Sequence, residues 1–173
     1  MRMSQVNSLV RVLTAAGVSL LFGAAFDCAR AEELQASLHP VDAAAKRVDM
    51  SMSWGDVLFK PGSKDKEVKI LVQIEDATVS SGEPLAQDGG PSIYRHALQI
   101  RNVSTCEDTS TDKGLGGELP DVDILSNGSA TLEITAVGIS MSQLPGKTVV
   151  LYRGKSAKEK RDIVACGVIG PKK

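Results

Sequence analysis

The sequence predicts an all-β domain, built as a Greek-key β-sandwich or flattened barrel, and three observations support this prediction. Apolar residues alternate with polar ones in several short segments, most regularly at Val68, Ile70, Val72 and Ile74, and a period of two is typical of half-buried strands. Clusters of Gly, Pro, Ser and Asp separate these segments, and no long segment has a helical pattern. Aromatic residues make up only 3% of the 173 residues while Gly occurs 16 times, which suits short strands joined by tight turns.

Strands and loops are expected to follow one another along most of the chain. A first strand would place Met50, Met52 and Trp54 on one face. Further strands are expected at 57–59, 68–74, 93–103, 130–136, 148–152 and 163–169. Loops or irregular stretches are expected at 80–91, 105–123, 139–144 and 153–162. Six or seven strands without a long helix favour an antiparallel architecture.

The first 31 residues have the pattern of a secretory signal peptide. Arg2 and Arg11 supply positive charge, residues 12–26 form an apolar run, and residues 29–31 (Ala-Arg-Ala) offer the small residues that signal peptidase needs. The apolar run is short for a bilayer, and no later stretch of about 20 apolar residues follows. We therefore expect cleavage after Ala31, a periplasmic or secreted protein, and no membrane span.

Cleavage would divide the chain into three regions. Residues 1–31 would be the signal peptide, residues 32–48 an N-terminal lead-in, and residues 49–173 the β-domain. The lead-in is expected to be a frayed helix or unstructured, because His39 precedes Pro40 and is pushed away from helical conformations.

Charge and cysteine content narrow the class of protein. The formal net charge is −1, so no basic field indicates a nucleic-acid partner. Cleavage would remove Cys28 and leave Cys106 and Cys166. An even pair in an exported chain predicts a disulfide; the alternative is two buried thiols that do not meet.

Several segments, in order along the chain, resemble the Cu/Zn superoxide dismutase family. The most specific is the run Ala-Cys-Gly-Val-Ile-Gly at 165–170, which is similar to the last strand of that family. Similar segments are found at 94–101, 117–121 and 144–152. The resemblance implies a flattened Greek-key barrel in which Cys166 closes an intrasubunit disulfide with Cys106.

Carried over residue by residue, the resemblance does not bring the family's metal ligands with it. Copper ligands would fall at Gln99, Arg101 and Tyr152, and zinc ligands at Leu115 and Glu118. Neutral imidazoles hold copper well, whereas an Arg guanidinium stays protonated and cannot bind a metal. The family's substrate-guiding Arg would fall at Ile163, with Arg161 two positions away. His96 alone stands at a family His position, and that His is structural.

These replacements predict a non-catalytic periplasmic binding or interaction module, without catalytic residues and without a cofactor. Its partner would be a periplasmic protein that the sequence does not identify, and a homodimer is a further expectation because family members often dimerise. Two alternatives stay open: a periplasmic copper-binding or copper-delivery protein, and an active superoxide dismutase.

The copper alternative depends on Met50, Met52 and Trp54, with His39 as an additional ligand. Thioethers are soft ligands that favour Cu(I), and an aromatic ring could cover the ion. The competing interpretation places Met50, Met52 and Trp54 on the buried side of the first strand.

Charged residues offer two further hypotheses. Arg101 could pair with Glu118, Asp121 or Asp123 where the family keeps its metals, or it could point into solvent. The basic run at 155–161 is expected to be a solvated loop, with docking of an acidic partner as the alternative.

Overall fold

The computed structural model describes residues 32–42, 47–78, 83–85, 92–106, 114–115, 119–154 and 162–173. The strands are β1 (Leu34–Asp42), β2 (Arg47–Val48), β3 (Gly55–Pro61), β4 (Glu67–Ile74), β5 (Glu83–Leu85), β6 (Ile93–Arg101), β7 (Val122–Leu125), β8 (Ala130–Val137), β9 (Thr148–Arg153), β10 (Ile163–Val168) and β11 (Gly170–Pro171). A 3-10 helix, η2 (Met141–Gln143), lies between β8 and β9.

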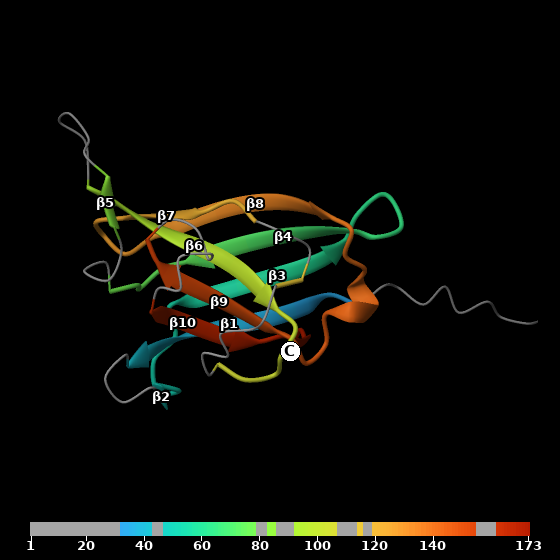
Figure 1. The fold of residues 1–173 in the computed structure, drawn as a ribbon, viewed down its shortest axis with the longest axis horizontal. Helices are drawn as coiled ribbons and strands as arrows, with labels where there is room; N and C mark the ends of the chain where they lie inside the picture. The colour runs from blue at the N-terminus through green and yellow to red at the C-terminus, as the bar shows by residue number, and fades with distance from the viewer. Residues whose placement is uncertain are drawn as a thin grey trace, which may run out of the picture.

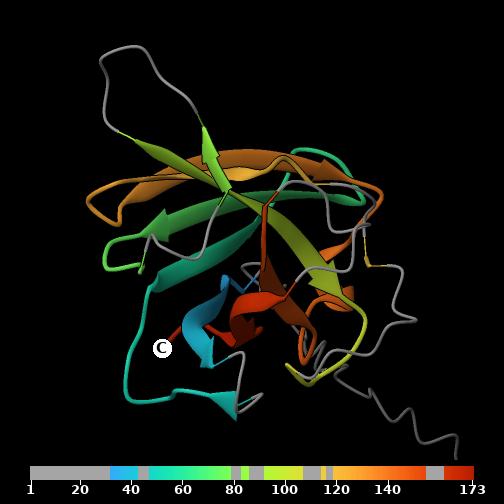
Figure 2. The same cartoon turned by 60° about the vertical axis from the view of Figure 1, so that its left-hand side comes forward.

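These strands join one antiparallel sheet, in the order β5-β6-β9-β10-β1-β3-β4-β8 (Figure 1). The short strands β2 and β11 pair with β1, and β7 pairs with β6. The neighbours β6 and β9, and likewise β4 and β8, are distant in sequence, which is the pattern of Greek-key crossovers. In the turned view, the sheet curves so that β4 and β8 lie across from β1 and β10 (Figure 2). The predicted all-β flattened barrel is therefore confirmed.

The core fills the inside of this curved sheet. Val68, Ile70, Val72 and Ile74 of β4 are all nearly or completely buried there, as their alternation with polar residues predicts. Leu34, Ala36, Leu38, Phe59, Leu98, Ile100, Val149 and Leu151 belong to the same cluster. A second, smaller apolar cluster comprises Ala97, Val150, Tyr152, Ile163 and Cys166. This second cluster lies on the opposite face of β6, β9 and β10, because strand residues alternate between faces.

The expected lead-in is wrong for residues 34–42, which form β1 near the middle of the sheet. β1 pairs with β3 over its first half and with β10 at His39 and Pro40. Leu34, Ala36 and Leu38 are buried, so burial of this face stabilises the strand. The preference of a residue before Pro for extended backbone, which argues against a helix, is compatible with a strand.

The predicted strand at Met50, Met52 and Trp54 is also wrong. Met50 is 69% exposed and Met52 49% exposed, whereas Trp54 is 3% exposed and belongs to the core. Residues 49–52 form a turn, in which the amide of Met52 donates to the carbonyl of Asp49 over 3.4 Å. In a turn, alternation of residue types does not place the side chains on one face, and β3 begins only at Gly55.

Two loop expectations need smaller adjustments. β5 lies within the expected loop 80–91, and β7 occupies the end of the expected loop 105–123. The remaining strands agree with the predicted ones to within a few residues, as β10 shows at 163–168.

The predicted disulfide between Cys106 and Cys166 is confirmed. Their Cα atoms are 5.8 Å apart and they are 60 residues apart in sequence. The bond ties the segment after β6 to β10. Loop closure of this length constrains the unfolded chain strongly.

Candidate functional site

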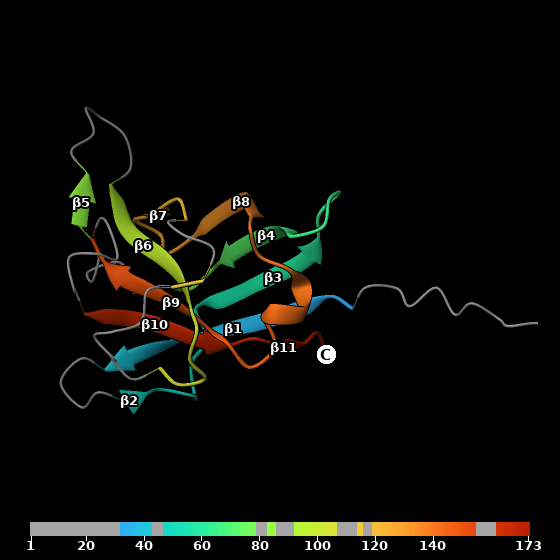
Figure 3. The same ribbon diagram turned by 45° about the vertical axis from the view of Figure 1, so that its right-hand side comes forward.

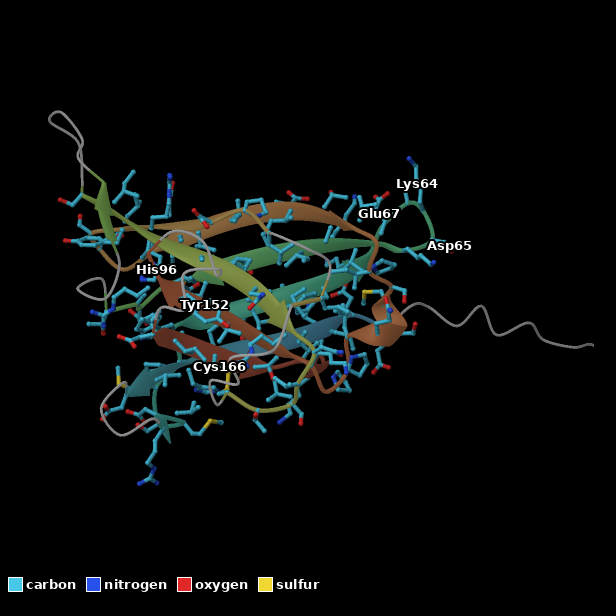
Figure 4. All side chains as sticks on the ribbon, viewed as in Figure 1. Lys64, Asp65, Glu67, His96, Tyr152 and Cys166 are labelled. Atoms are coloured by element: carbon cyan, nitrogen blue, oxygen red, sulfur yellow. A yellow bond between two sulfur atoms is a disulfide. The ribbon has the colours of Figure 1, made fainter. Side chains whose placement is uncertain are left out.

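The candidate site lies on the outer face of β6 and β9, where the resemblance would put copper. In the antiparallel pairing of these strands, Gln99 is opposite Val150, and Ala97 is opposite Tyr152. The hydroxyl of Tyr152 donates a hydrogen bond to Oε1 of Gln99 over 3.1 Å. Figure 4 shows Tyr152 in the middle of this face, between His96 and Cys166. Two residues at expected copper positions therefore bind each other.

Arg101, at the third expected copper position, is 1% exposed. It lies opposite Thr148 in the pairing of β6 and β9. The hydroxyl of Thr148 donates to the carbonyl oxygen of Val103 over 2.7 Å, which holds the chain after β6 close to β9. The alternative in which Arg101 points into solvent is wrong. The position of the metal ligand is occupied by a buried cation.

The carboxylates predicted for Arg101 have different outcomes. Asp123 forms an ion pair with Arg95, which lies opposite it in the register of β6 and β7. Two nitrogens of the Arg95 guanidinium donate, with Nε 2.7 Å from Oδ1 and Nη2 2.8 Å from Oδ2. This bond lowers the pKa of Asp123, because it stabilises the carboxylate. Glu118 lies outside the described residues.

Leu115, at an expected zinc position, is partly buried and packs against the core. Its amide donates to the carbonyl of Ile100 over 2.6 Å, so this part of the long connection lies along β6. The preceding Gly114 has a φ of +73° and is so close to Gln99 that a Cβ would collide with the Gln99 amide. This contact was not predicted, and the only signal for it was the high Gly content of the loop.

His96 is completely buried, as a structural residue would be. Its Nδ1 is 3.2 Å from the carbonyl oxygen of Tyr94, so Nδ1 carries a hydrogen and donates. Among the described residues Nε2 has no hydrogen-bond partner. Burial lowers the pKa of His96, because it penalises the charged imidazolium.

The other end of the site is closed by apolar residues. Ile163, at the position of the family's substrate-guiding Arg, is 7% exposed and packs with Tyr152 and Cys166. Arg161 and the basic run 155–161 lie outside the described residues. The described surface at this place is therefore apolar where a dismutase would need a cation.

The residues present do not fit the family's copper and zinc. Gln99 and Tyr152 are joined to each other, the protonated Arg101 cannot bind a metal, and Leu115 has no donor atom. Within the described ranges, no three His, Cys, Asp or Glu side chains gather as a group that could hold a metal ion. The site therefore lacks the ligands that superoxide dismutation in this fold requires.

The residues of the copper alternative lie elsewhere, and the structure separates them. His39 and Met50 line one groove beside the disulfide. Met52 is bound to His39 through its backbone, with its carbonyl oxygen 2.6 Å from Nδ1. Trp54 lies in the core, so it does not share the exposed surface of the two Met residues.

Comparison with known proteins supports the fold. No family model matches the chain, and no curated protein matches it. Among solved structures, Cu/Zn superoxide dismutase from Brucella abortus is similar, with a TM-score of 0.55 and 14% sequence identity. The match covers 80% of this chain and 100% of that one. The chain thus has the fold of a Cu/Zn superoxide dismutase. In the part of the chain that the structure describes, no helix is long and apolar enough to cross a membrane.

Proposed function

We propose that the chain is exported to the periplasm and acts there as a non-catalytic binding module on a Cu/Zn superoxide dismutase scaffold. The observation that carries this proposal is the hydrogen bond from Tyr152 to Gln99. It joins two expected copper positions, next to a buried Arg101. Fold and activity are separable, and catalysis of superoxide dismutation would need several metal ligands at these positions.

Export is supported by two features of different kinds. The signal-peptide pattern of residues 1–31 is a sequence feature. The Cys106–Cys166 disulfide is a structural one, and disulfides persist in oxidising compartments such as the periplasm. That the module binds a periplasmic protein, or a second copy of itself, stays a prediction.

A dismutase assay tests the loss of catalysis. The protein is exported to a periplasm replete in copper and zinc, dialysed, and assayed for dismutase activity with and without added metal. An authentic Cu/Zn superoxide dismutase treated in parallel is the positive control. We expect no activity above buffer and no zinc retained after dialysis. Activity that rises with added copper and zinc would overturn the proposal in favour of an active dismutase.

Copper binding is a second candidate function, and one observation favours it. His39 and Met50 line the same groove, away from Gln99 and Tyr152. Binding there would require none of the family's metal positions.

A further inference from the structure

A groove with a volume of about 420 Å³ lies beside the disulfide. Its wall includes Ser37 and His39 of β1, Met50 of the turn that follows β2, and Cys166 and Val168 of β10. Figure 3 shows β2 near one end of β1, and β11 beside β1 near the C-terminus. We propose that this groove binds one Cu(I) ion through Nε2 of His39 and Sδ of Met50. The inference rests on the proposed function, since it names a ligand for the binding module.

The first support is the orientation of the His39 ring. Nδ1 lies 2.6 Å from the carbonyl oxygen of Met52. Because a carbonyl oxygen only accepts, Nδ1 carries the hydrogen and the neutral ring keeps its lone pair on Nε2. A hydrogen bond from the second ring nitrogen to a backbone carbonyl is the usual way in which proteins orient a metal-binding His. The groove is thus lined by an imidazole whose free lone pair is on Nε2.

The second support is the way the backbone holds Met50 at the same groove. The amide of Asp49 donates to the carbonyl of Pro40 over 2.8 Å, which fastens the turn to β1 directly after His39. Oδ1 of Asp49 accepts from the amide of Ser51 at 3.0 Å and from its hydroxyl at 2.6 Å. Met50 stands between these two anchored residues. Its position is therefore fixed by hydrogen bonds on both sides, although its side chain is 69% exposed.

The third support is chemical. A thioether is a soft ligand that selects Cu(I), and imidazole also suits copper. Zn²⁺ sites instead use Cys, His and carboxylate ligands.

Anaerobic titration with Cu(I) against a chromophoric Cu(I) chelator tests the site. Ascorbate keeps the metal reduced and leaves the disulfide intact. We expect one Cu(I) per chain.

Three variants separate the proposed site from general thioether or surface binding. His39→Gln and Met50→Leu should each weaken Cu(I) binding at least about tenfold, since even loss of a residue that supports a ligand costs that much. Met141→Leu is the matched control, because Met141 is a partly buried Met on η2 that packs against the core. It should bind Cu(I) like the wild-type chain. Circular dichroism and thermal unfolding check the fold of each variant; Met50 is exposed, so its replacement should leave the fold unchanged.

The outcomes distinguish this inference from the proposed function. No Cu(I) binding by the wild-type chain would overturn the inference, and so would equal binding by all variants. Either result, in a sample without dismutase activity, would leave the non-catalytic module intact. Dismutase activity that depends on copper and survives Met50→Leu would overturn the proposed function and not the groove site.

Discussion

The hydroxyl of Tyr152 on β9 donates to the side-chain oxygen of Gln99 on β6 across the outer face of the sheet, over 3.1 Å. Tyr152 is 6% exposed. The pair occupies positions that the resemblance assigns to copper. The hydrogen bond provides a partner for the Tyr152 hydroxyl, because Tyr152 lies in an apolar cluster with Val150 and Ile163. A side-chain hydrogen bond therefore stabilises a face that the related fold uses for metal.

Removal of the Tyr152 hydroxyl should reveal the strength of this bond. We expect Tyr152→Phe to lower the free energy of unfolding by about 1 kcal/mol, the net worth of a typical hydrogen bond, or somewhat more because Gln99 loses its donor. Urea unfolding measures the change. A double-mutant cycle with Gln99→Leu isolates the pairwise contribution. A coupling energy of zero would show that the two side chains do not stabilise each other.

Parts of the fold and site were predictable from sequence because their cause is local. Val68 to Ile74 alternate with polar residues, and period two directly reflects which face is buried. The same period-two rule gives a wrong strand at Met50 and Met52. Hydrogen bonds of the Asp49 side chain with Ser51 hold this segment in a turn. β1 has the same alternation at Leu34, Ala36 and Leu38, but the stretch is short and contains Pro40. Its pairing with β10, far away in sequence, is not visible in a local pattern.

In the candidate site, too, residue type predicts some features, whereas others depend on contacts between distant strands. That Gln99, Arg101 and Tyr152 are unsuitable metal ligands follows from residue type alone. Other features depend on how β6, β9 and the long connection meet. These features are the hydrogen bond from Tyr152 to Gln99, the burial of Arg101 and the close approach of Gly114 to Gln99. The groove of His39 and Met50 likewise forms only when β1, the turn and β10 come together.

The disulfide should contribute most to stability among the features of the outer face. It closes a loop of 60 residues, which corresponds to about 4 kcal/mol in the chain-entropy account. We expect dithiothreitol to lower the urea midpoint accordingly, and Cys106→Ala with Cys166→Ala to show the same loss without reductant. The double variant should not respond to dithiothreitol. A wild-type midpoint unchanged by full reduction would contradict this prediction.

Burial of His96 should make the protein sensitive to mild acid. Its pKa in the folded state is lowered by burial, so the unfolded chain, in which His titrates near 6.5, binds the proton more readily. The contribution of His96 to stability is therefore complete above about pH 6.5 and is lost as the pH falls through that value towards the lowered pKa of the folded state.

Urea unfolding at several values between about pH 5 and pH 8, the range around the ordinary His pKa, measures this effect. We expect the free energy of unfolding to decrease with falling pH in the wild-type chain, and His96→Gln to flatten the slope. A slope that survives His96→Gln would assign the acid sensitivity to other groups.

Gly167 should be the least replaceable glycine of the 165–170 run. In the pairing of β1 with β10, a Cβ at Gly167 would collide with the carbonyl oxygen of Ser37. Gly170 has nothing within 4 Å of its Cβ position, which makes Gly170→Ala a matched control with the same effect on the unfolded chain. We expect Gly167→Ala to cost at least about 2 kcal/mol because the strands must separate, and Gly170→Ala to stay within about 0.5 kcal/mol of wild type. Gly167 also lines the groove beside β1, so we expect Gly167→Ala to weaken Cu(I) binding. Equal unfolding free energies for the two variants would show that β10 does not approach β1 as closely as described.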